Sequence, residues 1–425
     1  MTKRKIDLTI KRANELVTFR GSSKEPIHKK EMLDLQIIEN GAVAIDDGRI
    51  LAVEKTSEIE QRYKSEAVVD AKGKVVMPGF VDAHTHLVFA GAREREFEER
   101  LKGHSYLEIL ESGGGILSTV RETRESSKTQ LAEKAKKTLN VMLEHGTTTV
   151  EAKSGYGLTV ADEIKCLEVA QELDNNHRVE VVSTFLGAHA VPPEFHDNVD
   201  GYVRLVTEEM IPKVAEERLA EFCDVFCERN VFSIRQARQV LKAGTSCGLG
   251  PKIHADEITD LGGAKLAAEV KAISAEHLLF ASDEGLSAMA QRGVIAVLLP
   301  AASFSLMTGR YANARKMIGM GIPVALGTDF NPSCWTENMQ MAIAFACREM
   351  RLTPAEAIAA ATINAAHSIG RGQETGSLEI GKKANLIVLA VPNHSFLAYR
   401  FGVNLVENVV IDGEIVADRG CENGS

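Results

Sequence analysis

The stretch Pro78-Gly-Phe-Val-Asp-Ala-His-Thr-His86 closes an apolar, β-branched run that begins at Val75. Side chains two residues apart on a strand point to the same face, so His84 and His86 would present two imidazoles from one strand end. Such a pair suits a borderline metal ion such as Zn²⁺ or iron. A pair of hydrogen-bonded core histidines is the alternative, and it is weighed below against the other potential ligands of the chain.

Runs rich in Val, Ile and Thr recur at wide intervals after this stretch. They are Val75–Val81, Thr147–Val150, Val179–Thr184, Phe222–Phe226, Lys252–His254, Ala272–Ser274, Val294–Leu299 and Val324–Leu326. Helical patterns lie between them, such as the i, i+4 series from Leu131 to Leu143 that Gly146 closes. Strand and helix alternating eight times predicts an α/β fold of the (β/α)8 TIM barrel type.

The two ends of the chain have a different pattern. Residues 1–77 and 377–425 are strand-like, with turn signals at Asn40-Gly41, Asp46-Asp-Gly48 and Asp412-Gly413. We therefore expect a small composite β-sandwich domain formed from both termini. The barrel, residues 78–376, would be inserted between its two parts.

Composition limits the partners of the chain. A net charge of -10 over 425 residues argues against nucleic acid and anionic membranes, since both need a basic face. The start Met1-Thr-Lys-Arg-Lys lacks the apolar stretch of a signal peptide, and no run approaches the ~18 apolar residues of a membrane span. The seven cysteines are scattered, and Cys223 and Cys227 are interpreted as core residues. We expect a cytoplasmic protein, working as a homodimer.

Polar residues follow several of the predicted strands at the end where barrel enzymes place their chemistry. In strand order they are His84 and His86, His189, His254 and Glu257, His277, and Asp329. The set His84, His86, His254 and Asp329 offers three nitrogens and one oxygen, with a coordination position left for water. The sequence therefore predicts one Zn²⁺ or Fe³⁺ per chain.

A two-metal site is the alternative, because a strand-end lysine such as Lys153 can be carbamylated to bridge two ions. With Lys153 and His189 as ligands, however, His277 would have no role. Lys153 also stands beside Glu151, an ordinary ion-pair partner. The single-metal interpretation is favoured.

Longer motifs resemble the amidohydrolase superfamily over nearly the whole chain. They are Pro78–His86, His254-Ala-Asp-Glu257 and Gly376-Ser-Leu-Glu-Ile-Gly-Lys-Lys-Ala-Asn385. Within it, three further strings resemble the imidazolonepropionase family: Glu151-Ala-Lys-Ser-Gly-Tyr-Gly-Leu158, Phe185-Leu-Gly-Ala-His-Ala-Val-Pro-Pro-Glu194 and Thr328-Asp-Phe-Asn-Pro332. The resemblance implies a hydrolase of cyclic amide C–N bonds, which opens 4-imidazolone-5-propanoate to N-formimidoyl-L-glutamate in histidine degradation.

Carried over by position, the resemblance gives metal ligation to the same four residues. It assigns substrate contacts to Arg93, Tyr156, His189, Glu257 and Asn331. Where the family has a glycine followed by a hydroxyl residue, this chain has Ser333-Cys334, which remain candidate contacts, as does Tyr106.

The residue types fit this chemistry. Asp329 can take a proton from the attacking water and pass it to the leaving ring nitrogen, while His277 orients the water or stabilises the oxyanion. Glu257 can accept from a ring N–H. Arg93 is the expected partner of the anionic propanoate, with Tyr156 and Tyr106 as hydroxyl donors, and a plain surface arginine is its alternative interpretation.

Two other functions compete. Deaminases of purine or pyrimidine rings in this superfamily share the two strand-end histidines, the His-x-x-Glu pair, the further histidine and the aspartate, but they need no carboxylate clamp. Arg93 with Tyr156 therefore favours a small anionic heterocyclic substrate. A catalytically silent barrel serving as an assembly subunit is the second competitor, and the complete set of metal ligands argues against it.

Overall fold

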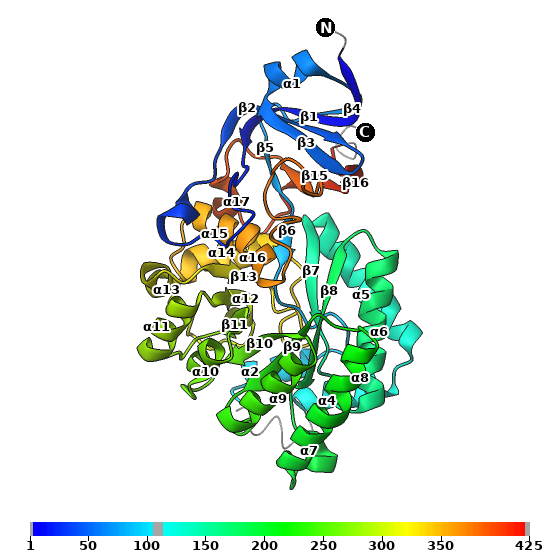
Figure 1. Ribbon diagram of the computed structural model, residues 1–425, viewed down its shortest axis with the longest axis vertical. Coiled ribbons are helices and arrows are strands. Elements are labelled where there is room, and N and C mark those ends of the chain that lie inside the picture. Colours follow the sequence, from blue (N-terminus) through cyan, green and yellow to red (C-terminus); the bar gives the residue numbers. More distant parts are fainter. Residues whose placement is uncertain (1–2, 105–113, 421–425) are drawn as a thin grey trace.

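The computed structural model describes residues 3–104 and 114–420, and it contains two sheets (Figure 1). The larger body is a barrel in which each neighbouring strand pair is parallel. Its strands are β6 Phe80–Asp82, β7 Thr147–Lys153, β8 Glu180–Ala188, β9 Phe222–Cys227, β10 Gly250–Ala255, β11 Ser274–His277, β12 Ile295–Leu298 and β13 Val324–Leu326. The predicted (β/α)8 barrel with a smaller β domain from both termini is confirmed.

Helices surround the barrel strands in the described part of the chain (Figure 1). They are α2 Glu94–Leu101, α4 Ile116–Glu125, α5 Lys128–Glu144, α6 Val160–Asn176, α7 Val199–Leu205, α8 Ile211–Glu216, α9 Ile234–Ser246, α10 Gly263–Glu269, α11 Asp283–Arg292, α12 Pro300–Ser305, α13 Ala314–Met320, α14 Met339–Glu349, α15 Pro354–Ala360 and α16 Ile363–Ser368. Capping boxes at Ser127, Ser233 and Thr353 begin α5, α9 and α15, because each side chain accepts from a backbone N–H that the helix leaves free. Shorter turns are η1 Lys29–Leu33, η2 Pro193–Phe195 and the π-type η3 Val206–Met210.

The barrel closes between its first and last strands just beyond their carboxyl ends. An isolated parallel bridge joins Thr85 to Phe330. The backbone N–H of Asp329 donates to the carbonyl of His84 over 3.0 Å. Below this bridge the buried Asp82 carboxylate accepts from the backbone N–H of Thr328 at 2.9 Å and from its hydroxyl at 2.6 Å. The closure therefore fixes the two predicted ligand segments side by side.

The second sheet combines strands from both ends of the chain, as the blue and red ribbons of Figure 1 show. Its strands are β1 Arg4–Leu16, β2 Ile38–Asp46, β3 Arg49–Lys55, β4 Tyr63–Asp70, β5 Val75–Pro78, β14 Leu386–Leu389, β15 Val406–Ile411 and β16 Glu414–Asp418, with helices α1 Thr56–Arg62 and α17 Phe396–Tyr399. Residues 46–48 form the predicted turn between β2 and β3, whereas Asn40-Gly41 lies inside β2. The sheet has its own apolar cluster, separate from the barrel core.

The run Val75–Val81, predicted as one barrel strand, is two strands in different sheets. β5 pairs with β14 and β1 in the terminal sheet, and only β6 belongs to the barrel. The change of sheet falls at Pro78-Gly79. Pro78 has no N–H to donate, and a Cβ at Gly79 would lie 2.3 Å from a methyl group of Thr148 on β7.

No helix in the described ranges is both long enough and apolar enough to cross a bilayer.

Candidate active site

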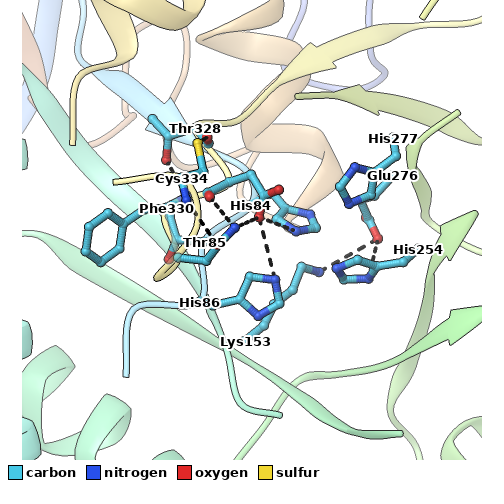
Figure 2. A network of polar contacts seen from close by, with 12 residues as sticks. His84, Thr85, His86, Lys153, His254, Glu276, His277, Thr328, Phe330 and Cys334 are labelled. Carbon is cyan, nitrogen blue, oxygen red and sulfur yellow. Dashed lines mark hydrogen bonds and ion pairs between the residues drawn. The ribbon is translucent and has the colours of Figure 1, made fainter. Parts of the chain in front are cut away.

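The predicted site residues follow the carboxyl ends of the barrel strands. Figure 2 shows His84, His86, His254 and His277 gathered around one region. His277 and Asp329 have φ values of 68° and 52°, the left-handed region that side chains other than glycine seldom adopt. Backbone held in that region at the ends of two barrel strands is typical of a functional site.

His84, His86 and Asp329 form the first half of the candidate metal centre. Asp329 Oδ1 lies 3.5 Å from His84 Nε2 and 3.7 Å from His86 Nε2. All three side chains are almost completely buried. Their ligand atoms lie within 4.8 Å of one another, which is close enough for one ion to contact them all.

His254 and His277 form the other half, from β10 and β11. The His84 and His254 rings lie 4.6 Å apart between centroids, and the His254 and His277 rings 5.2 Å apart. Within the described residues, Nε2 of His84 and of His254 are buried without a hydrogen-bond partner. Buried polar atoms are normally paired, so these nitrogens fit a metal ion as their missing partner. The four predicted ligands therefore come together, and His277 is a fifth donor beside them.

Burial controls the protonation of this cluster. It lowers the pKa values of His84, His86 and His277 well below their ordinary range. Neutral imidazole is the form that binds metals. Burial also raises the pKa of Asp329 to about 6, against the pull of His254. A bound cation would oppose that increase and favour the ionised carboxylate.

His254 differs from the other ligands because a carboxylate stands behind it. Burial lowers its pKa, but Asp224 outweighs burial and the net pKa is raised. Asp224 Oδ2 lies 3.0 Å from His254 Nδ1. A histidine whose Nδ1–H faces a carboxylate keeps its Nε2 lone pair available for a metal ion, and its basicity is increased.

One loop beside the metal centre places Tyr156 and His189. The buried Glu163 carboxylate accepts backbone N–H groups of Gly155, Gly157 and Leu158 at 2.8 to 3.1 Å, which fixes the loop. His189 Nδ1 donates to the Gly155 carbonyl over 3.0 Å, and a Cβ at position 155 would lie 2.8 Å from that nitrogen. Burial lowers the pKa of His189 to about 3, so its ring is neutral with Nε2 free to accept.

Arg93 lies next to Tyr156 rather than at the surface. It precedes α2 and hydrogen-bonds the Tyr156 hydroxyl, whose pKa burial raises. Among the described residues Arg93 Nε is buried and has no hydrogen-bond partner. Arg93 thus has a free donor on a guanidinium that is already partly buried, which suits a carboxylate ligand.

Glu257 and His277 face each other, with Glu257 Oε1 3.6 Å from His277 Nδ1. Burial, aided by the charge of Asp329, raises the pKa of Glu257 to about 8. A carboxyl group poised near neutral pH is suited to proton exchange.

The other predicted substrate contacts that the structure describes, Asn331, Ser333 and Cys334, differ in where they lie relative to Asp329. Asn331 donates to Asp329 Oδ1 over 2.9 Å and accepts from the backbone N–H of Ser333 at 2.7 Å, so it holds the ligand and the following turn. The Cys334 thiol is buried, 3.5 Å from both the Thr328 carbonyl and the Ser305 hydroxyl. Tyr106 lies outside the described residues.

Sequence reasoning named Lys153 and Glu151 as an ion pair, which the structure contains. It missed the larger group of charged side chains inside the barrel below the histidines, to which that pair belongs and which we call the barrel floor. It consists of Glu151, Lys153, Asp224, Lys252 and Glu276, each at most 1% exposed. The available signal was charged residues inside strand runs, within three positions of the strand end. The notable member is Lys153, which ion-pairs with Glu151 at 3.0 Å and Asp224 at 2.8 Å.

Comparison with known proteins agrees with this geometry. The model of the amidohydrolase family matches residues 75–416, so the chain belongs to that family. An adenosine deaminase from Xanthomonas campestris with bound zinc is similar in fold, with a TM-score of 0.71 and 19% identity over 98% of this chain and 94% of that one.

Curated relatives narrow the assignment. The imidazolonepropionase of Geobacillus sp. (strain WCH70) is 56% identical over 97% of this chain and 98% of that protein. The imidazolonepropionase of Geobacillus thermodenitrificans (strain NG80-2) is also 56% identical, with the same shares covered. The chain is a member of the imidazolonepropionase family, as its motifs predicted.

Proposed function

We propose that this chain hydrolyses 4-imidazolone-5-propanoate to N-formimidoyl-L-glutamate, a ring-opening step of histidine degradation. One observation supports this above all: the buried cluster of His84, His86 and Asp329 lies near the partly buried Arg93, whose Nε has no hydrogen-bond partner among the described residues. The first part suits hydrolysis, and the second suits an anionic substrate.

The proposed ligands of a single Zn²⁺ or Fe³⁺ are His84, His86, His254 and Asp329. When bound, such an ion supplies a water whose pKa is lowered from 15.7 toward ~7. His277 is also close enough to bind a metal. We assign it instead to orienting the water, because the four proposed ligands already supply three nitrogens and one oxygen and leave a position for water.

Proton transfer is proposed for Asp329, with Asn331 and His277 supporting the reaction. Asp329 accepts the proton of the attacking water and delivers it to the ring nitrogen that leaves. Asn331 holds the Asp329 carboxylate in the orientation for this by donating to Oδ1. Neutral His277 stabilises the oxyanion that develops on the ring carbonyl.

Substrate recognition is proposed for the groups around the metal centre. Arg93 binds the propanoate carboxylate, together with the Tyr156 hydroxyl that it already contacts. Glu257 accepts from a ring N–H, and neutral His189 accepts through Nε2. Ser333, the Cys334 backbone and Tyr106 complete the proposed contacts.

The decisive experiment is to mix the purified, metal-loaded protein with 4-imidazolone-5-propanoate and follow the loss of its ultraviolet absorbance. We expect turnover and the appearance of N-formimidoyl-L-glutamate. Parallel reactions with adenosine, guanine and cytosine test for release of ammonia. Ammonia from those rings without consumption of the imidazolone would assign the chain to the deaminases instead.

We further propose a homodimer that acts in the cytoplasm without a nucleic-acid partner, and domains of residues 78–376 for the barrel and 1–77 with 377–425 for the termini. Free cysteines in the described ranges are consistent with a reducing compartment. Light scattering of the eluted protein tests the dimer, which a monomer mass would contradict.

A further inference from the structure

The Lys153 ammonium lies in the barrel floor with three carboxylates around it, as a bound metal ion would. It is 2.8 Å from Asp224 Oδ2, 3.0 Å from Glu151 Oε2 and 3.8 Å from Glu276 Oε2. Each of these side chains is fully buried, so solvent does not screen the charges. Figure 2 shows Lys153 and Glu276 directly beside His254.

The second floor cation does not occupy the same place. Lys252 contacts Glu151 through the other oxygen, at 2.8 Å, and donates to the Ser368 carbonyl at 3.2 Å. It makes no hydrogen bond or ion pair with Asp224 or His254 in the described part of the chain, whereas Glu276 Oε1 lies 3.7 Å from it. Three carboxylates and two ammonium groups leave the floor with one excess negative charge, and removing Lys153 would leave two.

The donors around Lys153 would suit a metal ion. Ligand atoms of Asp224, His254 and Glu276 all lie within 4.8 Å of one another. Glu276 Oε2 is buried without a hydrogen-bond partner among the described residues, and Glu151 Oε2 faces the Lys153 ammonium. Carboxylate oxygens 2.8 to 3.0 Å from an ammonium need to move inward by less than about 1 Å to reach the ~2.0–2.2 Å of a transition-metal contact.

We propose that the Lys153 ammonium occupies the position of a second divalent cation and thereby restricts this barrel to a single metal ion. The role is one of positioning and selection, because Lys153 does not touch the substrate side of the histidines. Three buried carboxylates facing one point must be neutralised by protons or by cations, and a covalently attached ammonium does so permanently. The inference rests on the single-metal site proposed above.

The test is metal stoichiometry. Full-length wild type, Lys153→Ala and Lys252→Ala are prepared metal-free, loaded with excess Zn²⁺ or Mn²⁺, dialysed and measured by elemental analysis. Lys153→Ala opens space for an ion and its water and should hold two equivalents per chain. Wild type and Lys252→Ala should hold one, since Lys252→Ala also removes a buried ammonium but leaves Lys153 in place.

The double variant Lys153→Ala/Asp224→Asn should return to one equivalent, because it loses the carboxylate nearest the new site. One equivalent in Lys153→Ala would overturn the role of Lys153 while leaving the single-metal site intact. Two equivalents in wild type would contradict the single-metal site itself.

Folding can be used as a second measurement. If Lys153→Ala unfolds without metal, Mn²⁺ should restore its circular dichroism spectrum and bind at two equivalents. Failure of Mn²⁺ to restore folding would overturn the proposal, because a divalent cation would then be unable to replace the ammonium.

Discussion

The mouth of the barrel, which is the cluster of His84, His86, His254, His277 and Asp329, and the barrel floor are both buried and polar. They differ in how their nitrogen atoms are paired. In the mouth, His84 Nε2 and His254 Nε2 have no hydrogen-bond partner in the described residues. In the floor, both ammonium groups lie within 3.0 Å of a carboxylate oxygen. The two regions meet at His254, because Asp224 and Glu276 each contact Lys153 on one side and His254 on the other.

This difference separates side chains that bind a ligand from side chains that stabilise the barrel. A buried polar group without a partner costs free energy, so a protein keeps one only where something else binds it. A buried ion pair that is complete needs no ligand and fixes the shape of the barrel. Variants of the mouth should therefore change metal binding and turnover, and variants of the floor should change stability first.

The largest effect is expected for Asp329→Asn. The variant loses an ionised ligand and the proposed proton acceptor, so kcat should fall by up to ~10⁴-fold, the upper range for acid–base catalysis. Metal content, measured on the same sample, should decrease as well. Thermal melting of the metal-free protein should stay close to wild type, and a kcat within tenfold of wild type would remove Asp329 from the mechanism.

Lys252→Met tests the floor. It leaves Glu151 without its 2.8 Å ammonium partner, and breaking a buried pair costs about 3–5 kcal/mol of unfolding free energy. Urea unfolding monitored by circular dichroism measures the loss. Metal content should remain at the wild-type value. A variant as stable as wild type but poor in metal would reverse the proposed division between mouth and floor.

His277→Asn separates orientation of the water from metal binding. The asparagine keeps a hydrogen-bonding side chain but loses the imidazole, so kcat should decrease by ~10²-fold with the metal retained. Loss of metal together with activity would instead make His277 a ligand. Glu257→Gln, on the other side of the 3.6 Å contact, serves as the matched variant that leaves all candidate donors in place.

Arg93→Met should lower kcat/KM by ~30-fold, which corresponds to a loss of about 2 kcal/mol of transition-state stabilisation. The reason is that the propanoate would be buried without its charged partner. Arg93→Lys should recover part of this, since lysine keeps the charge but loses the two-donor fork. The comparison substrate is the neutral amide analogue. Equal preference for acid over amide in wild type and Arg93→Met would mean that Arg93 does not bind the carboxylate.

The smallest effect concerns pH. Burial raises the pKa of Glu257 in the folded protein from 4.5 to about 8, so folding favours its protonated form. That stabilisation is complete below pH 4.5 and is lost as the pH rises through about 8. In metal-free protein, the Tm of wild type should therefore fall relative to the Tm of Glu257→Gln as the pH rises from 4.5 to about 8. The Glu257 side chain is 18% exposed to water, which limits the size of this difference in Tm. If the Tm values of the two proteins change equally with pH, the raised pKa of Glu257 is contradicted.

Sequence patterns predicted much of the mouth but little of the floor. His84, His86, His254 and Asp329 stand at strand ends, and parallel strands that share one barrel bring their ends together whatever the details of packing. Interior charges such as Asp224 and Glu276 lie within strand runs instead. Their partners depend on which strands are neighbours across the barrel, and this cannot be read from local spacing.

By itself the sequence determined the alternation of strands and helices, the (β/α)8 barrel and the residue types at each strand end, because these follow from local periodicity and short motifs. The tertiary structure alone decided that Val75–Pro78 leaves the barrel for the terminal sheet, since that pairing joins segments about 300 residues apart. It also decided the surroundings of Lys153. The carboxylates around its ammonium come from three different strands, so these charges are brought together only when the barrel closes.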